Sequence, residues 1–217
     1  MRALSFVAML SLAVTSAASG GQLQDARAML FQGDVGGADE ALAQVLALPP
    51  TTDDAEAHAL RSITRVLRVV QSGEGGPDPG AIDSVGELLD GFGYGSVGRD
   101  IFGWSSSPPR DAQGRLDLPA NSPTGGDIAR VLDLALLAAI SGALTDLAAL
   151  EPSFSLIVSA AEIQQFAIAY GDVSAPQGAD PEIEYADARL YEAALGAAAA
   201  TILVSLAYDF NFDLDEL

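Results

Sequence analysis

A glycine-rich stretch near the middle of the chain has a spacing that could bind phosphate. Gly93-Tyr-Gly95-Ser-Val-Gly98 matches the G-x-G-x-x-G pattern of dinucleotide-binding proteins, and Asp117 follows near the position of a ribose-binding acid. That pattern functions where a strand precedes it and a helix follows. Residues 84–90 have a helical pattern instead, and no strand-helix alternation follows. We interpret the stretch as a glycine-rich loop and predict no cofactor.

His58, the only histidine, is a second candidate for chemistry. It could act as the base of a Ser-His-Asp triad, but the chain has no G-x-S-x-G turn, and at Ser96 Tyr94 replaces the first glycine. We therefore predict a structural or surface role for His58. The chain also has neither lysine nor cysteine. These absences exclude a P-loop lysine, a Schiff-base lysine, a cysteine nucleophile and thiolate zinc sites.

Oxygen-bearing side chains alternate near Leu217, as at the start of a Ca²⁺-binding EF-hand loop. They are Asp209, Asn211, Asp213 and Asp215. Leu214 stands where that loop needs a glycine for its sharp turn, and no glutamate follows at the twelfth position. We interpret these residues as a solvated acidic edge, with a weak Ca²⁺ site as the alternative, and predict no metal ligands.

Three arginines, Arg61, Arg65 and Arg68, recur at helical spacing. Such a stripe could hold an acidic partner, or it could pair with the chain's own acids. The acids closest to its start are Asp53, Asp54 and Glu56. We favour the structural interpretation, because helical surfaces commonly pair their charges in this way.

The overall charge argues against nucleic acid as a partner. The chain has 30 acidic residues against ten arginines, a formal net charge of -20, so phosphate backbones would be repelled. Among so many carboxylates, nothing selects a pair suited to glycoside hydrolysis. We predict no catalytic residues and no enzyme activity.

The first 18 residues have the features of a secretory signal peptide. Met1-Arg2 is basic, residues 3–14 are apolar apart from two serines, and small residues precede a cut after Ala18. We predict export to a bacterial periplasm or beyond. Stability there must come from packing, since no cysteine is present to form a disulfide.

Hydrophobic periodicity and breaking residues predict a mostly α-helical chain. Residues 22–71 have a helical pattern with breaks at Gly33-Asp34 and Pro49-Pro50, and Asp53 caps the third piece. The strongest boundary is the Gly/Pro-rich run at 73–80. Beyond it we expect a helix at 81–89, an ordered Gly/Pro-rich loop at 91–123 with a turn at 110–114, a helix from Thr124 to about 150, a strand at 154–158, a helix at 160–170, a loop at 172–181 and a helix at 184–209.

Two runs in the later helices carry no formal charge, residues 134–144 and 193–208. Both are shorter than the roughly 20 residues that a bilayer-spanning helix needs. We interpret both as buried core helices and predict no membrane span after signal cleavage.

Residues 28–50 resemble a tetratricopeptide unit. They have the Gly33-Asp34 turn, a small residue at Ala38, the Ala41-Leu42 packing pair and a proline at the end. Residues 55–60 resemble the opening of a second unit, so the likeness covers about residues 22–71. The resemblance implies helical hairpins that bind other proteins.

The rest of the chain is similar to uncharacterised exported bacterial proteins with a repeat-like N-terminus. The similarity rests on residues 98–104, 121–126 and 207–213. Those proteins tend to continue further, which implies a short member or a fragment. The resemblance implies no activity.

Taken together, these features predict a mostly α fold: a signal peptide (1–18), repeat-like helical hairpins (22–71), and a helical core (80–217) with a long ordered loop (91–123) and at most one or two short strands. The leading functional hypothesis is a non-enzymatic protein-interaction or scaffold module of the bacterial envelope, with a protein partner. The alternative is a Ca²⁺-dependent acidic structural protein, and a carboxylate-pair hydrolase is third.

Overall fold

A computed structural model describes residues 20–50, 53–70, 82–94, 110–115, 117–169 and 180–208. The architecture is mostly α-helical with a two-stranded antiparallel sheet, which confirms the predicted fold class. The helices are residues 20–31, α2 (Val35–Leu46), α3 (Asp54–Val70), α4 (Val85–Gly91), α5 (Gly125–Arg130), η1 (Val131–Leu137), α6 (Ala138–Ala148), α7 (Ala160–Ala169) and α8 (Tyr185–Leu206). The strands are β1 (Ser155–Ile157) and β2 (Glu182–Glu184).

The first turn of the repeat-like segment lies where the sequence predicts it. Gly33 has a φ of 89°, a conformation that favours glycine over any residue with a Cβ. Asp34 then caps α2, its carboxylate accepting a hydrogen bond from the Gly37 N–H at 2.9 Å. These two residues reverse the chain, so that α2 follows the helix over residues 20–31 as a hairpin.

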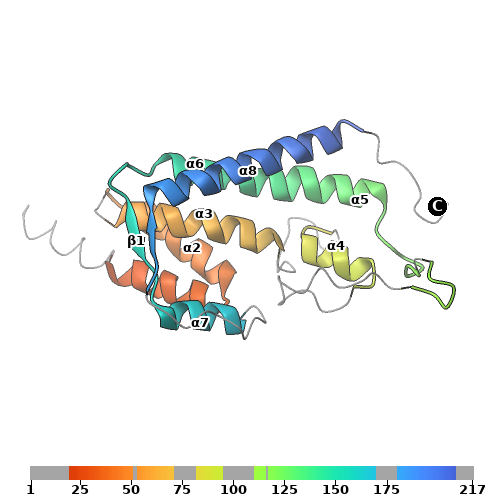
Figure 1. Cartoon of the computed structure of the whole chain (residues 1–217), viewed down its shortest axis with the longest axis horizontal. Coiled ribbons are helices and arrows are strands. Elements are labelled where there is room, and N and C mark those ends of the chain that lie inside the picture. The colour runs from red at the N-terminus through yellow and green to blue at the C-terminus, as the bar shows by residue number, and fades with distance from the viewer. Residues whose placement is uncertain are drawn as a thin grey trace, which may run out of the picture.

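Helix α3 occupies the middle of the molecule. It begins at Asp54, directly after the predicted cap Asp53, and packs against α2 on one side and α6 on the other (Figure 1). Residues from the repeat-like segment and from the later helices therefore share one buried core. That core includes Leu42, Leu60, Ile140, Leu147 and Leu195.

Residues 125–148 form one continuous helix made of α5, η1 and α6. It begins with a reciprocal cap, in which the Thr124 hydroxyl accepts from the Asp127 N–H and the Asp127 carboxylate accepts from the Thr124 N–H. This cap confirms the predicted start at Thr124. The segment η1 is π-helical, with each turn wider than in the α-helix on either side.

The two strands join segments that are distant in sequence. β1 lies within the predicted strand at 154–158, and it pairs with β2 so that Leu156 is opposite Ile183. β2 was not predicted: residues 172–181 were expected to be a loop and the helix to begin at 184. An acidic Glu-Ile-Glu triplet has little strand preference of its own, and its extended form depends on pairing with β1.

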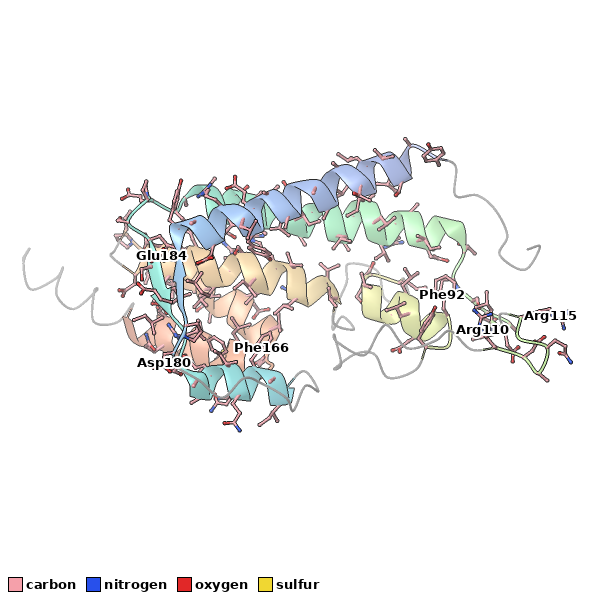
Figure 2. The ribbon with its side chains drawn as sticks, in the orientation of Figure 1. Phe92, Arg110, Arg115, Phe166, Asp180 and Glu184 are labelled. Atoms are coloured by element: carbon pink, nitrogen blue, oxygen red, sulfur yellow. The ribbon has the colours of Figure 1, made fainter. Side chains whose placement is uncertain are left out.

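Helix α7 packs at one side of the repeat-like segment, and a polar turn lies at the opposite end of the molecule. Phe166 of α7 meets Phe31 edge to face, with ring centroids 6.2 Å apart. The predicted turn at 110–114 is confirmed by the hydrogen bond from the Asp111 N–H to the Arg115 carbonyl oxygen at 2.9 Å. Figure 2 shows Arg110 and Arg115 far from Glu184, at the other end of the molecule.

Helix α8 runs antiparallel to the helix over residues 125–148 along one edge of the molecule (Figure 1). Among the described residues, these two helices are long and apolar enough to cross a membrane, judged by length and composition alone. The expectation that both are buried core helices is wrong: only 28% of the most apolar stretch of residues 125–148 is buried, and only 11% of that of α8. For α8, the physical reason is that its described neighbours contact one side of the helix only.

Candidate functional site

The exposed side of α8 is the largest departure from what the sequence predicts. We define its outer seam as seven residues that follow one another at steps of three or four, the spacing of a helix face. They are Ala186, Leu190, Ala193, Ala197, Thr201, Val204 and, directly after the helix, Tyr208. All seven are exposed, and the three largest have 72% (Leu190), 61% (Val204) and 71% (Tyr208) of their surface accessible.

The opposite side of α8 carries a second seam, which is already occupied. This inner seam consists of Ala188, Leu195 and Ile202, spaced seven residues apart and all buried. Leu190, Ala197 and Val204 each lie two residues after an inner-seam residue, which is a rotation of about 200° around an α-helix. One helix therefore has two apolar sides, and only one of them packs against the described part of the chain.

The outer seam has few polar groups that could interact with water. No residue from Ala193 to Tyr208 carries a formal charge. The Thr201 hydroxyl donates to the Ala197 carbonyl oxygen at 2.9 Å, so it is satisfied within the helix. Contiguous apolar surface of this kind is typical of a site that contacts another molecule.

A cluster of charged side chains joins α3 to α6. Asp146 is buried, and its two carboxylate oxygens accept from His58 Nδ1 at 2.9 Å and from Arg65 Nε at 2.7 Å. Gly142 makes room for Arg65, because a Cβ there would lie 2.5 Å from its Nη1 atom. His58 thus has a partner within the fold, Asp146, which the sequence did not identify.

A polar cavity of about 620 Å³ lies beside His58, at the start of α3. Its lining includes Asp53, Glu151 and Ser155. A histidine oriented by a carboxylate is half of a general-base arrangement. Ser155, however, donates its hydroxyl to Glu182 at 2.5 Å and so does not complete such an arrangement.

The arginine stripe of α3 is paired within the chain. Arg65 binds Asp146, and Arg61 and Arg68 both approach Asp39 of α2, at 3.6 and 3.4 Å. This confirms the structural interpretation of the stripe. The expected partners Asp53, Asp54 and Glu56 are not those seen in these three pairs, because the stripe faces α2 and α6 rather than the start of its own helix.

Arg27 forms a second ionic network that the sequence did not predict. Its guanidinium donates to Glu56 and to Glu162, each at 2.5 Å, and to the Ile157 carbonyl oxygen. The hydrogen bonds from Arg27, together with those from Ser159, lower the pKa of Glu162 to about 2. The network holds the helix over residues 20–31 against α3, β1 and α7.

An apolar cavity of about 380 Å³ lies between α3, α6, α8 and the sheet. Ile63, Phe154 and Ile183 are among the residues around it. Tyr191 of α8 also lines it, and burial raises the pKa of the Tyr191 hydroxyl. The inner side of α8 is therefore close to its neighbours without being fully packed.

The remaining sequence candidates are only partly described. Helix α4 precedes Gly93, which confirms that a helix rather than a strand leads into the glycine-rich stretch, and Gly93 itself has a φ of 81°. Residues 95–100 and the acidic run 209–215 lie outside the described residues. Within the described ranges, no three His, Asp or Glu side chains are grouped as metal ligands would be. In comparisons with known proteins, no family model, no curated protein and no solved structure matches the chain.

Proposed function

We propose that this chain is an exported, non-enzymatic protein-interaction module of the bacterial envelope, and that it docks through the outer seam of α8. The single observation that carries the proposal is the exposure of Leu190, Val204 and Tyr208 along a charge-free helix face. A helix that is apolar on every side is normally buried on every side. The partner that fits is a protein presenting an apolar helix face of its own.

The charged surfaces of the chain support the same choice of site. The stripe on α3 would suit an acidic peptide, but its arginines are held by Asp39 and Asp146. An acidic partner would have to break these pairs and leave the buried Asp146 and the partly buried Asp39 without a counter-charge, which is costly. Docking through the outer seam breaks no contact of the described fold.

A lipid bilayer is a poorer occupant than a protein. The helix over residues 125–148 is fastened to α3 by the Arg65–Asp146 pair, so a bilayer around it would have to surround α3 and its arginines. The net charge of -20 also repels anionic membrane surfaces. The proposal therefore keeps the expectation of no membrane span after signal cleavage.

Site-specific photo-cross-linking tests the proposal. A photoreactive amino acid replaces Val204 on the outer seam or, as a matched control, Ile168 of α7, which is 62% exposed. In cells of the source organism, we expect a discrete protein adduct from position 204 and none of that mass from position 168. The substitution Leu190→Asp, made in the position-204 protein, should abolish the adduct because it places a charge in the seam.

Two results would contradict the proposal. One is an adduct to lipid from position 204. The other is a pattern of protein adducts that is the same from both positions and unaffected by Leu190→Asp. Circular dichroism of the Leu190→Asp protein should match that of the unsubstituted chain, which excludes unfolding as the cause of any loss.

A further inference from the structure

We infer that the apolar cavity between α3, α6, α8 and the sheet is a binding site for a small uncharged ligand, namely an apolar molecule of about two rings with one hydrogen-bond acceptor. The inference concerns the inner side of α8 and does not depend on the outer seam. It rests on the volume of the cavity, on the residues that line it and on the hydroxyl of Tyr191.

The cavity is large for a gap in a folded interior. Close-packed interiors contain few voids larger than a water molecule. This cavity has a volume of about 380 Å³, and pockets that bind small molecules begin at about 300 Å³. A cavity of roughly 150 Å³ holds one benzene molecule, so the space here fits a molecule of about two fused rings or an aliphatic molecule of similar size.

The walls of the cavity are apolar and come from α3, α6, α8 and both strands. Helix α3 contributes Ala59 and Ile63, which are four positions apart and therefore share one face of the helix. The strands contribute Leu156 and Ile183, which are paired across the sheet, and α6 contributes Leu147. Because these elements pack together in the core, the site is formed without a ligand.

The hydroxyl of Tyr191 is a hydrogen-bond donor in this apolar environment. Burial raises its pKa, so it stays protonated and able to donate at neutral pH. Within the described part of the chain it has no hydrogen-bond partner, although a buried tyrosine hydroxyl usually has one. The Ser62 hydroxyl, in contrast, already donates to the Ala59 carbonyl oxygen at 2.7 Å. A carbonyl or ether oxygen on the ligand would supply the acceptor that Tyr191 lacks.

The charges around the cavity disfavour an ionised ligand. Asp187 lines the cavity at its exposed margin, so a ligand carboxylate would lie close to a second negative charge. None of the described lining residues is basic, and Arg189 of the same helix is held by Glu192 and by the Leu147 carbonyl oxygen. A cation would exchange its hydration for walls that are mostly apolar, which is costly. An uncharged ligand avoids both penalties.

Three naphthalene probes of similar size test the class of ligand. Naphthyl methyl ketone is uncharged and has an acceptor, ethylnaphthalene is uncharged and has none, and naphthoate is an anion. In equilibrium dialysis against the purified chain at neutral pH, we expect both uncharged probes to bind saturably and naphthoate to bind more weakly by roughly tenfold or more. Tyr191→Phe should weaken ketone binding about fivefold, the effect of one neutral hydrogen bond, and leave ethylnaphthalene binding unchanged.

A substitution that fills the cavity tests the location. Ala188 is buried and lines the cavity, so Ala188→Phe places a ring in the space and should weaken ketone binding by more than about tenfold. The matched control is Ala186→Phe, on the exposed opposite side of α8, which should bind the ketone as the unsubstituted chain does. Filling a gap commonly stabilises a fold, so the thermal midpoint of Ala188→Phe should not fall. If this variant does not fold, Tyr191→Phe still decides, because it removes only one oxygen atom.

Any of three results would overturn the inference. The first is the absence of saturable binding by both uncharged probes up to their solubility limits, which would make the cavity a packing gap only. The second is ketone binding that Tyr191→Phe does not weaken or that a folded Ala188→Phe chain retains. The third is naphthoate binding as tight as that of the ketone. Cross-linking from position 204 does not involve the cavity, so failure of this inference and failure of the proposed function are distinguishable.

Discussion

Helices α3 and α8 both pack against the helix over residues 125–148, yet they leave opposite kinds of surface to solvent (Figure 1). α3 is rich in charge, and its three arginines are all paired with acids of this chain. α8 carries no formal charge from Ala193 onward and keeps a complete apolar side exposed. The arginines of α3 are therefore paired within the fold, whereas one apolar side of α8 is left in contact with solvent.

The difference follows from two unequal free-energy costs: that of burying a charge without a partner, and that of leaving an apolar side chain in water. A buried charge without a partner is very unfavourable, so a fold that buries Asp146 must bring Arg65 and His58 to it. An apolar side chain left in water only forgoes stabilisation, at about 25 cal/mol for each Å² that stays exposed. An open apolar face can therefore persist in a folded chain, and it remains available for assembly.

The largest expected effect separates the two seams of α8. Ile202→Gln should lower the free energy of unfolding by about 4 kcal/mol, because it removes buried apolar surface and leaves an amide without hydrogen-bond partners. Val204→Gln, two residues further on, should change it by less than about 0.5 kcal/mol. Urea unfolding of each variant beside the unsubstituted chain measures both. Similar losses for the two variants would mean that the outer seam is packed within the monomer.

An intermediate effect is expected where charge joins α3 to α6. Asp146→Asn removes the counter-charge of Arg65, and we expect it to lower the free energy of unfolding by about 3 kcal/mol. Asp133→Asn is the matched control, since Asp133 is exposed on the same helix, and it should have an effect below about 0.5 kcal/mol. Thermal and urea unfolding provide the comparison. If Asp146→Asn were neutral, the pairing with Arg65 would not contribute to holding α3 on α6.

The smallest of the three effects concerns pH. The pKa of Glu162 in the fold is about 2, below its ordinary value of 4.5, so its ionised form stabilises the fold fully above pH 4.5. That contribution should be lost as the pH falls from 4.5 toward 2. Glu162→Gln should cost about 2 kcal/mol at pH 7, and the difference from the unsubstituted chain should shrink across this window. A difference that stays constant from pH 7 to pH 2 would contradict the role assigned to Arg27.

Much of the helical fold was predictable because its signals are local. The glycine at 33, the cap at Thr124 and the turn at 110–114 each depend on residues a few positions apart. β2 depends on β1, more than twenty residues away, and a Glu-Ile-Glu triplet carries no signal of that partner. The π-helical segment has no signature that we recognised in its apolar sequence either.

The candidate site was predictable only in part. Hydrophobicity indicated that α8 is apolar, but it could not tell whether one or both sides would be covered. The heptad of Ala188, Leu195 and Ile202 looks the same in sequence as that of Leu190, Ala197 and Val204, and only tertiary packing distinguishes them. The acids that pair with the α3 arginines could not be predicted from the local sequence either, because Asp39 and Asp146 come from other helices.

Because of the π-helical segment, the helix over residues 125–148 should tolerate the loss of a residue better in one part than in another. A π-helical turn holds an extra residue that an α-helical turn does not, so removing one residue from Val131–Leu137 can restore a regular helix without reorienting its two ends. Removing one residue from α6, for example Ser141, would instead rotate one flank by about 100° and carry Asp146 away from Arg65. Natural insertions and deletions in this helix should therefore collect at its wide turns and avoid the segment that meets α3.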